Sequence, residues 1–449
     1  MTERAPLPRR PPTMGHQVVG EAPGRRAVTC RGPGRGRGSA LLALGVLWAG
    51  LGPLPARLAD AAVPAVESVA SPTPLPVVFS SGSVTFVSLS TGWALGTVPC
   101  AGPGRCLALR RTVDGGRTWK ARPLPEALLR AVNRTQSGYP VLDSGATGYT
   151  VRFADPADGW LLGPAGGART TLWATHDGGA GWHVVKSLPG LDAGALFDVE
   201  AARGTVYALG LSTGGYGTGA AVAASPVGRD AWRAVRAPAL GMPAGGAQPT
   251  GSIVLQGGAG WLVEGNDRGV TGSARLLPDG NWGAWTAPCR AVGDSYTVPA
   301  AAGPTRLFAL CQMGGFASSL SPAAPPGAAL GSTWLYGSAD AGTSFHPVVQ
   351  LGAGYTASKP AAVIGFGTLA AASARSLVVG RWAPRPGLLA SFDGGLHWQV
   401  VHQGAISYVG FTSPEQGVAI TAPTGPASGG PTGMIMTRDG GRHWAPVHF

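Results

Sequence analysis

The stretch that decides the fold is Thr112-Val113-Asp114-Gly115-Gly116-Arg117-Thr118-Trp119, because it recurs along the chain. Later copies keep the frame Ser/Thr-x-Asp-x-Gly-x-x-aromatic and occupy residues 175–182, 338–345, 391–398 and 437–444. The aspartates of the five copies are Asp114, Asp177, Asp340, Asp393 and Asp439. Widely spaced copies of one short unit are typical of a repeat architecture.

The residue types of this frame predict a β-hairpin turn. An aspartate side chain accepts hydrogen bonds from backbone N–H groups a residue or two ahead, which closes a turn. The glycine two places on adopts a positive φ without steric cost. The aromatic residue then begins the outgoing strand, where its ring can be buried. Each copy is therefore expected to join two antiparallel strands.

A second pattern precedes the turns: an apolar strand, a tight turn, then Gly-Trp-Ala-Leu-Gly or a relative of it. Its clearest copies occupy residues 84–96 and 151–163, and weaker copies begin at Tyr207, Gly260, Phe308, Leu377 and Gly417. We call this second pattern the lead. Seven leads require seven turns, so two of the turns must depart from the Ser/Thr-x-Asp-x-Gly-x-x-aromatic frame, and we call these two turns damaged. Residues 225–232 have Val227 at the aspartate position, and residues 280–285 have Asp279 one place out of frame. The expected closing aromatics are Trp119, Trp182, Trp232, Trp285, Phe345, Trp398 and Trp444.

Units of roughly 45–60 residues fit four-stranded blades. The sequence therefore predicts an all-β fold, a seven-bladed β-propeller of four-stranded antiparallel blades over residues 84–449. The turn frame resembles the Asp-box, or bacterial neuraminidase repeat, which in that family is a structural turn between the third and fourth strands of a blade. The full pattern, clearest over residues 151–182, most resembles the photosystem II assembly factor type of propeller. The resemblance implies the fold, and the photosystem role is not carried over.

The first 61 residues predict export. Residues 1–38 hold eight arginines against two glutamates and so supply +6 of the formal net charge of +12. An apolar run over residues 40–51, two prolines and the small residues around Ala59 follow in the order of a secretory signal peptide. We expect a signal peptide over residues 1–61 and a Pro/Ser-rich linker over residues 62–83, with the protein secreted or otherwise extracytoplasmic. An uncleaved membrane anchor is the alternative interpretation.

Four cysteines follow residue 61, and an even number in an exported protein favours disulfides. Cys100 and Cys106 flank a Gly/Pro loop and are expected to pair across it, which leaves Cys289 to pair with Cys311. A zinc site is the competing interpretation, but the two pairs lie far apart without nearby histidines. We expect the histidines in or beside the turns to lie on different blades, where they cannot share a metal ion: His176, His183, His397 and His443.

An Asp-box propeller also suggests a sialidase, a family that needs an arginine cluster, a Tyr–Glu nucleophile pair and an acid/base aspartate. No Arg-Ile-Pro signature of that family occurs, and none of the five glutamates after residue 61 lies in a recognisable catalytic frame: Glu67, Glu126, Glu200, Glu264 and Glu415. We therefore expect no catalytic residues, no metal and no cofactor. A sialidase-like or other glycoside hydrolase remains the alternative, and carboxylates converging on the central channel would favour it.

Strand topology indicates where a ligand is expected to bind. In a four-stranded blade the 1–2 and 3–4 turns share one face, here the box face. The 2–3 loops and the connections between blades share the opposite face, here the loop face. Loop lengths vary most on the loop face, and variable loops on a rigid scaffold commonly carry binding sites. Arginine and aromatic residues are enriched at binding hot spots, and the candidates there are Arg105, Arg169, Tyr216, Arg268, Phe316, Arg381, Trp382 and Arg385.

After residue 61 the chain has 25 Lys/Arg and 19 Asp/Glu, an excess of six positive charges. This excess favours an acidic partner. We expect a monomeric, non-catalytic binding or scaffold module for a protein or an anionic envelope polymer. Nucleic acid is not expected, because the chain carries an export signal and no base-reading motif.

Overall fold

Seven four-stranded antiparallel sheets make up the part of the chain that the structure describes. A computed structural model describes residues 79–100, 105–132, 149–164, 170–212, 219–241, 250–266, 269–291, 296–313, 325–326, 328, 331–352, 366–381, 385–422 and 432–449. These residues all lie in the second of two compact units, Met1–Ser71 and Pro72–Phe449. Among the described residues, no helix combines the length and the apolar character that crossing a membrane requires.

Each sheet takes four consecutive strands, and we number the sheets as blades 1 to 7. Blade 1 contains β1 (Ser80–Phe86), β2 (Gly92–Pro99), β3 (Arg105–Thr112) and β4 (Lys120–Arg122). Blade 2 contains β5 (Thr150–Phe153), β6 (Gly159–Pro164), β7 (Thr170–Thr175) and β8 (His183–Val184). Blade 3 contains β9 (Leu191–Ala202), β10 (Thr205–Ser212), β11 (Ala220–Pro226) and β12 (Arg233–Leu240). Blade 4 contains β13 (Thr250–Gln256), β14 (Ala259–Asn266), β15 (Gly269–Leu276) and β16 (Trp282–Ala284).

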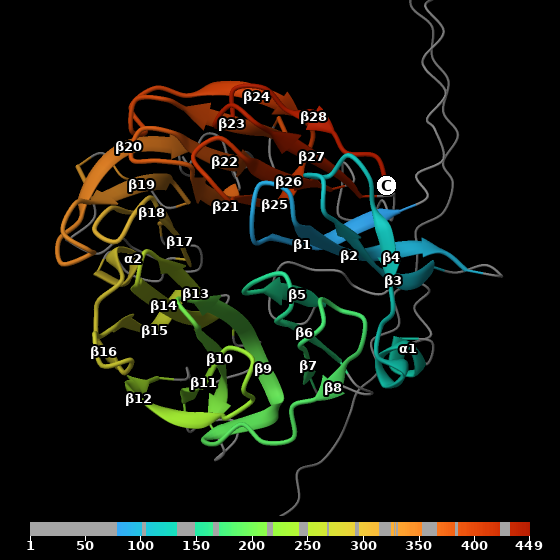
Figure 1. Cartoon of the computed structure of the whole chain (residues 1–449). Helices are drawn as coiled ribbons and strands as arrows, with labels where there is room; N and C mark the ends of the chain where they lie inside the picture. The colour runs from blue at the N-terminus through green and yellow to red at the C-terminus, as the bar shows by residue number, and fades with distance from the viewer. Residues whose placement is uncertain are drawn as a thin grey trace, which may run out of the picture. The chain divides into compact units, whose positions relative to one another are not determined.

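Blade 5 contains β17 (Tyr296–Ala301), β18 (Leu307–Gln312), β19 (Thr333–Ser338) and β20 (His346–Gly352). Blade 6 contains β21 (Phe366–Ala371), β22 (Leu377–Arg381), β23 (Gly387–Ser391) and β24 (Gln399–Gln403). Blade 7 contains β25 (Ile406–Phe411), β26 (Gly417–Thr421), β27 (Gly433–Thr437) and β28 (Ala445–Pro446). Helix α1 (Glu126–Val132) follows blade 1, and α2 (Pro288–Ala291) precedes blade 5. The sheets form a ring with the first strand of each blade on the inside (Figure 1), which confirms the predicted seven-bladed propeller.

The hydrophobic core lies between the blades. Each of seven apolar clusters combines residues from two neighbouring blades, one cluster for each seam of the ring. The lead tryptophans Trp93, Trp160 and Trp261 lie on second strands and are at most 1% exposed. Burying such large side chains contributes much of the hydrophobic stabilisation of a fold. The Gly-Trp leads therefore supply the contacts that hold neighbouring blades together.

The turns around the five frame aspartates share a pattern of hydrogen bonds. In blade 1, Asp114 Oδ1 accepts the backbone N–H groups of Arg117 (3.0 Å) and Thr118 (2.9 Å). Thr112 Oγ1 donates to the same oxygen and accepts the N–H of Gly116, whose φ is 86°. Asp177, Asp393 and Asp439 each accept two backbone N–H groups in the same way, and Asp340 accepts one.

The same turns are tied to the 1–2 turn of their own blade. Gly115 N–H donates to Ser90 O, and the equivalent residues of four other blades, Gly178, Ala341, Gly394 and Gly440, make the matching bond. Between blades, Trp93 Nε1 donates to Gly178 O and Trp261 Nε1 donates to Ala341 O, each at 3.0 Å. These turns therefore lie together on the box face.

The two damaged turns differ from the intact ones. The expectation that Trp285 begins the outer strand of blade 4 is wrong, because β16 starts at Trp282. A bond from Leu277 N–H to Asn281 O closes this turn early, and Trp285 Nε1 instead donates to Gly342 O of blade 5. The indole N–H groups of Trp232 and Trp282, which follow the damaged turns, have no partner among the described residues.

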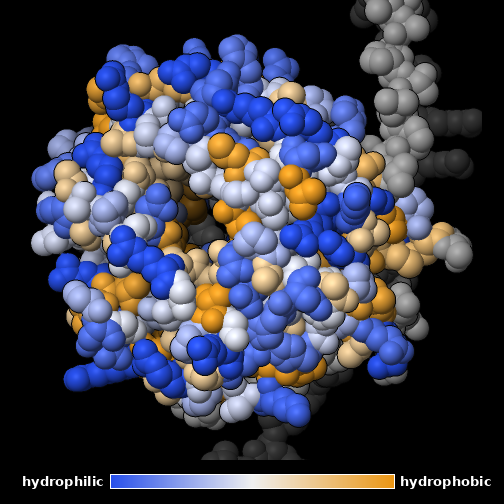
Figure 2. All heavy atoms as spheres, in the orientation of Figure 1, coloured by the Kyte–Doolittle hydropathy of each residue, from blue (hydrophilic) through white to orange (hydrophobic). Residues whose placement is uncertain are grey.

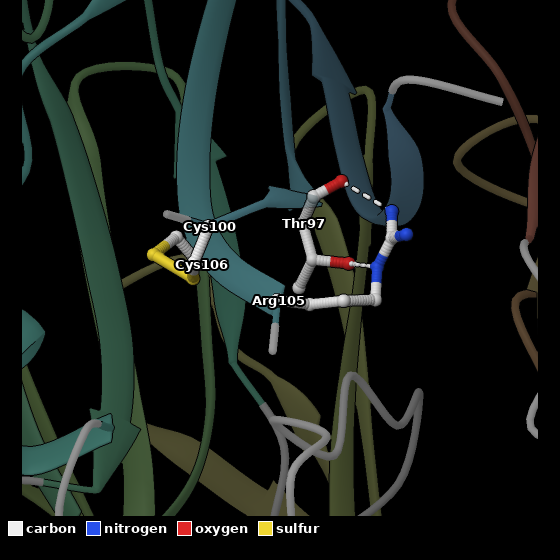
Figure 3. The surroundings of a disulfide bond; sticks show 4 residues. All are labelled: Thr97, Cys100, Arg105 and Cys106. Carbon is white, nitrogen blue, oxygen red and sulfur yellow. Dashed lines mark hydrogen bonds between the residues drawn. A yellow bond between two sulfur atoms is a disulfide. The ribbon is translucent and has the colours of Figure 1, made fainter. Parts of the chain in front are cut away.

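Both predicted disulfides are present. Cys100–Cys106 joins the ends of β2 and β3, and Cys289–Cys311 joins α2 to β18. Figure 3 shows the first of them beside Arg105, whose guanidinium points toward Thr97 on the neighbouring strand.

Candidate functional site

The centre of the ring contains a cavity of about 280 Å³ that is lined by all seven first strands. Figure 2 shows the hollow in the middle of the molecule. One part of its wall is polar and contains Arg152, Asp198, Glu200 and Tyr408. Another part is apolar and contains Val254, Val298, Pro299 and Leu369. The channel is therefore the concave site with convergent polar groups that ligand sites usually show.

Strand register explains why the polar groups meet. Arg152 of β5 pairs with Trp160, and Glu200 of β9 pairs with Tyr207, so the two residues occupy equivalent positions in neighbouring blades. The equivalent residue of β25 is Gly410, which pairs with Val418. A Cβ at Gly410 would lie 2.4 Å from the hydroxyl of Tyr408. The ring of Tyr408 thus lies over Gly410. The Tyr408 hydroxyl therefore reaches the same position along the inner strands as Arg152 and Glu200.

An ion pair joins the first two of these residues across the seam of blades 2 and 3. Arg152 Nε donates to Glu200 Oε1 at 2.5 Å, and Arg152 Nη1 donates to Val151 O at 3.1 Å. Their side chains keep 19% and 26% of their surface exposed, so they border the channel rather than the sealed core. Burial lowers the pKa of Arg152, but the charges of Glu200, Tyr408 and Asp198 and the hydrogen bond to Glu200 together outweigh this and leave that pKa raised. Burial also raises the pKa of Tyr408.

Asp198 connects blades 3 and 4 at the same channel. Its Oδ2 accepts the backbone N–H of Ile253 at 2.9 Å, and its Oδ1 accepts that of Val199 at 2.9 Å. Burial, and after it the charge of Glu200, raises the pKa of Asp198. The channel therefore disfavours the charged form of this carboxyl group.

Two carboxylates thus face the channel, the arrangement set out above as favouring a glycoside hydrolase. Both oxygens of Asp198 and one oxygen of Glu200 already accept hydrogen bonds, and two of these bonds, from Ile253 and Arg152, join neighbouring blades. Among the described residues that line the cavity, Arg152 supplies the one guanidinium. These bonds hold the polar side chains in fixed positions, and such a rigid, preformed wall suits recognition of a ligand.

Of the candidate residues on the loop face, the structure describes three. Arg105 donates from Nε to Thr97 Oγ1 (2.7 Å) and from Nη2 to Thr97 O (2.8 Å) and Ser80 Oγ (2.7 Å), as Figure 3 shows in part. Arg381 Nε donates to Arg385 O at 2.7 Å, and Arg385 is exposed. Arg105 belongs to blade 1 and the other two to blade 6, so blade 7 separates them. The remaining candidates lie outside the described residues: Arg169, Tyr216, Arg268, Phe316 and Trp382.

The expectation that the turn histidines could not converge is wrong for two of them. His176 and His183 both belong to blade 2 and lie beside Asp230 of blade 3. One ligand atom from each of the three residues lies within 4.8 Å of the other two. The sequence prediction failed because His176 and His183 flank one turn of blade 2 rather than lying on different blades, and Asp230 approaches them from blade 3.

Sequence reasoning also missed the residues of the channel. Glu200 is one of the glutamates outside any recognisable catalytic frame, and no motif in the sequence distinguishes Arg152, Asp198 or Tyr408. A signal was available, because aligning the seven first strands on their Gly-Trp leads puts Arg152 and Glu200 at one level. Side chains at one level of the inner strands meet around the axis of a propeller.

Comparison with protein-family models and with curated proteins found no match. Among solved structures, YCF48 bound to D1 peptide is 17% identical with a TM-score of 0.48, over 81% of this chain and 95% of that one. YCF48 from Cyanidioschyzon merolae is 13% identical with a TM-score of 0.49, over 82% and 97%. The BP39L lectin from Burkholderia pseudomallei is 11% identical with a TM-score of 0.51, over 82% and 99%. These likenesses concern the fold. The seven-bladed fold matches the YCF48 structures at low sequence identity.

Proposed function

We propose that this chain is an exported, non-catalytic β-propeller that binds a partner protein. In this proposal, a polar side chain of the partner enters the central channel. The observation that carries the proposal is the ordered polar wall formed by Arg152, Glu200, Asp198 and Tyr408 in a hollow of about 280 Å³. The two disulfides support export, because such bonds persist in oxidising compartments.

The charges of the channel favour a protein partner over an anionic polymer. Two carboxyl groups face one guanidinium there, so an additional negative charge would meet more repulsion than attraction. A hydrogen-bond donor, such as an amide, hydroxyl or ammonium group, can use the second oxygen of Glu200. The acidic partner expected from composition is better placed against the loop face, where Arg385 is exposed.

A glycoside hydrolase is the second candidate, favoured by the two carboxylates in the channel. Retaining and inverting enzymes both need one carboxyl group to protonate the leaving oxygen and a second one free to act on the sugar or on water. Asp198 and Glu200 are both engaged in bonds between blades. Release of sugar from glycans of the native envelope by the wild-type protein would establish the hydrolase and overturn the non-catalytic proposal.

Blocking the channel tests the proposal. Ser252 is half-buried and lines the cavity, so Ser252→Arg places a long side chain in it. The matched control is Arg117→Ser, an exposed residue of the box face. In pull-downs from the native envelope fraction, we expect Ser252→Arg to lose the partner at least about 10-fold, equivalent to 1.4 kcal/mol, while Arg117→Ser retains it. Equal capture by both variants, with unchanged circular dichroism, would contradict binding in the channel.

A further inference from the structure

A cluster of histidine and aspartate side chains lies at the seam between blades 2 and 3, on the box face. His176 follows Thr175 in the intact turn of blade 2, His183 is the first residue of β8, and Asp230 lies in the damaged turn of blade 3. Asp230 Oδ2 lies 3.1 Å from His176 Nε2 and 2.5 Å from His183 Nε2. Three potential ligand atoms from two blades therefore converge on one point.

A second carboxylate fixes the ring of His176. Asp158 Oδ1 lies 2.5 Å from His176 Nδ1, and the Asp158 side chain is 17% exposed. A histidine that donates Nδ1–H to a carboxylate presents the lone pair of Nε2, and metal-binding histidines are commonly oriented in this way. Here the Nε2 atom faces Asp230. An imidazole lone pair and a carboxylate oxygen at 3.1 Å need a cation between them, either a proton or a metal ion.

The cluster lies where the usual bond between blades is missing. Two other seams have such a bond. Trp93 of blade 1 donates to Gly178 O in the intact turn of blade 2, and Trp261 of blade 4 donates to Ala341 O in the intact turn of blade 5. In blade 3 the turn is damaged, with Val227 at the aspartate position. Trp160 of blade 2 accordingly has a buried indole N–H without a partner among the described residues. A different link between blades 2 and 3 would compensate for this loss.

We propose that His176, His183 and Asp230 bind one zinc ion that joins blades 2 and 3, with Asp158 as the positioning residue for His176. Two imidazoles and one carboxylate suit zinc, whereas calcium and magnesium prefer oxygen ligands. Ligand atoms about 2.0–2.2 Å from a tetrahedral zinc lie about 3.3–3.6 Å apart. The separations of 2.5 and 3.1 Å must therefore widen toward that range when the ion binds, and the third pair of ligand atoms already lies within 4.8 Å. Water takes the fourth position, because the His183 side chain is 50% exposed.

Zinc binding is measured directly with the mature chain, free of any polyhistidine tag and stripped with a chelator. Zinc is titrated in competition with a chromophoric chelator, and wild type should bind one equivalent. His183→Gln and Asp230→Asn should each weaken zinc binding at least about 100-fold, and Asp158→Asn about 10–100-fold, the usual effect of removing a carboxylate that supports a ligand. Wild-type Tm should rise with zinc, whereas the Tm of Asp230→Asn should not.

His443→Gln is the matched control. Like His176, His443 lies in an intact turn and has its Nδ1 close to a carboxylate, 2.6 Å from Asp439 Oδ2. Among the described residues, however, it belongs to no three-residue cluster that could bind a metal ion. This variant should bind zinc as wild type does. Cobalt in place of zinc should give the intense visible absorption of a tetrahedral site. A wild-type protein that binds no zinc, or a His443→Gln variant that loses as much affinity as His183→Gln, would overturn the proposal.

Discussion

The ring of Phe79 packs against the ring of Phe449, with centroids 4.3 Å apart and planes inclined by 37°. Each blade uses consecutive strands, so the N-terminal strands form blade 1 and the C-terminal strands form blade 7. Among the described residues, these two blades are joined by an apolar cluster and by two hydrogen bonds, Thr432 Oγ1 to Ser81 O and Arg438 Nη2 to Gly115 O. Phe449 is thus part of the contact that closes the ring.

Removing this aromatic ring should destabilise the whole propeller. Phe449 also lies 4.9 Å from Trp119, ring centre to ring centre. We expect Phe449→Ala to lower the free energy of unfolding by about 2–3 kcal/mol, near the lower end for aromatic truncations because the residue is only half-buried. Urea unfolding measures the change. Leu396→Ala, at a side chain that is 58% exposed, is the control and should change little; equal effects of the two variants would contradict the role in closure.

The frame aspartates should stabilise the fold except in strong acid. Bonds from the backbone N–H and the ring of His397 hold the pKa of Asp393 well below its usual range. A carboxylate with a lowered pKa contributes stability above pH about 4, and this is lost as pH falls through the folded-state pKa. Asp393→Ala should therefore lower Tm at pH 7 more than Asp393→Asn does, and the gap from wild type should narrow toward pH 2. Calorimetry at both pH values checks this, and a gap that widens in acid would refute it.

Glu264 should make the protein less stable as pH rises. Its side chain is 1% exposed between Gly251 and Gly272 on the paired strands, and neither oxygen has a partner among the described residues. Burial raises its pKa to about 8. The unfolded chain releases this proton near pH 4.3. Between about pH 4.5 and 8 the folded protein therefore holds a proton that the unfolded chain has lost, so the free energy of unfolding falls as pH rises across that window.

Glu264→Gln removes this dependence, because the amide is neutral in both states. The variant should exceed wild type in unfolding free energy by roughly 2–4 kcal/mol at pH 9 and by much less at pH 5. Urea unfolding at both pH values provides the measurement. Glu126→Gln, where the glutamate side chain is 79% exposed, should show no such gain. A Glu264→Gln variant with the same pH profile as wild type would show that the carboxyl group is ionised in the folded protein.

The loop-face arginines should support binding of an acidic region of the partner. Changing Arg381 and Arg385 together to Ser should weaken partner binding, most clearly at low salt, because the Debye length falls to about 3 Å at 1 M. Folding should be unaffected, since the bond between these residues is exposed. The paired control replaces Arg117 and Arg442 on the box face. A larger loss of binding from the control pair would mean that the box face is the binding face.

Export predicts a mature chain with an N-terminus near Ala62 and without free thiols. Intact-mass measurement of secreted protein should give the mass of residues 62–449 less four hydrogens for the two disulfides. Alkylation without reduction should label no cysteine. A retained N-terminus would instead support the anchor interpretation, and four alkylated cysteines would refute the pairing in the exported protein.

The number of blades and the Cys100–Cys106 disulfide followed from local patterns in the sequence, and the Cys289–Cys311 disulfide then followed as the remaining pair. A turn around Asp114 uses bonds that reach at most four residues along the chain, so its signature survives as a short readable frame. Cys100 and Cys106 are separated by six positions across one hairpin. The outer strand of blade 4 could not be placed this way, because early closure at Asn281 removed the regular spacing.

Only the tertiary structure brought together the groups with chemistry. Arg152 and Glu200 are 48 residues apart, and His183 and Asp230 are 47 apart. Each pair joins two blades, so it depends on how the ring positions neighbouring sheets and on which level of a strand faces the axis. A repeat predicts that blades exist, because each blade closes its own turns. It does not show which unrelated side chains meet across a seam, because those contacts arise only when the ring closes.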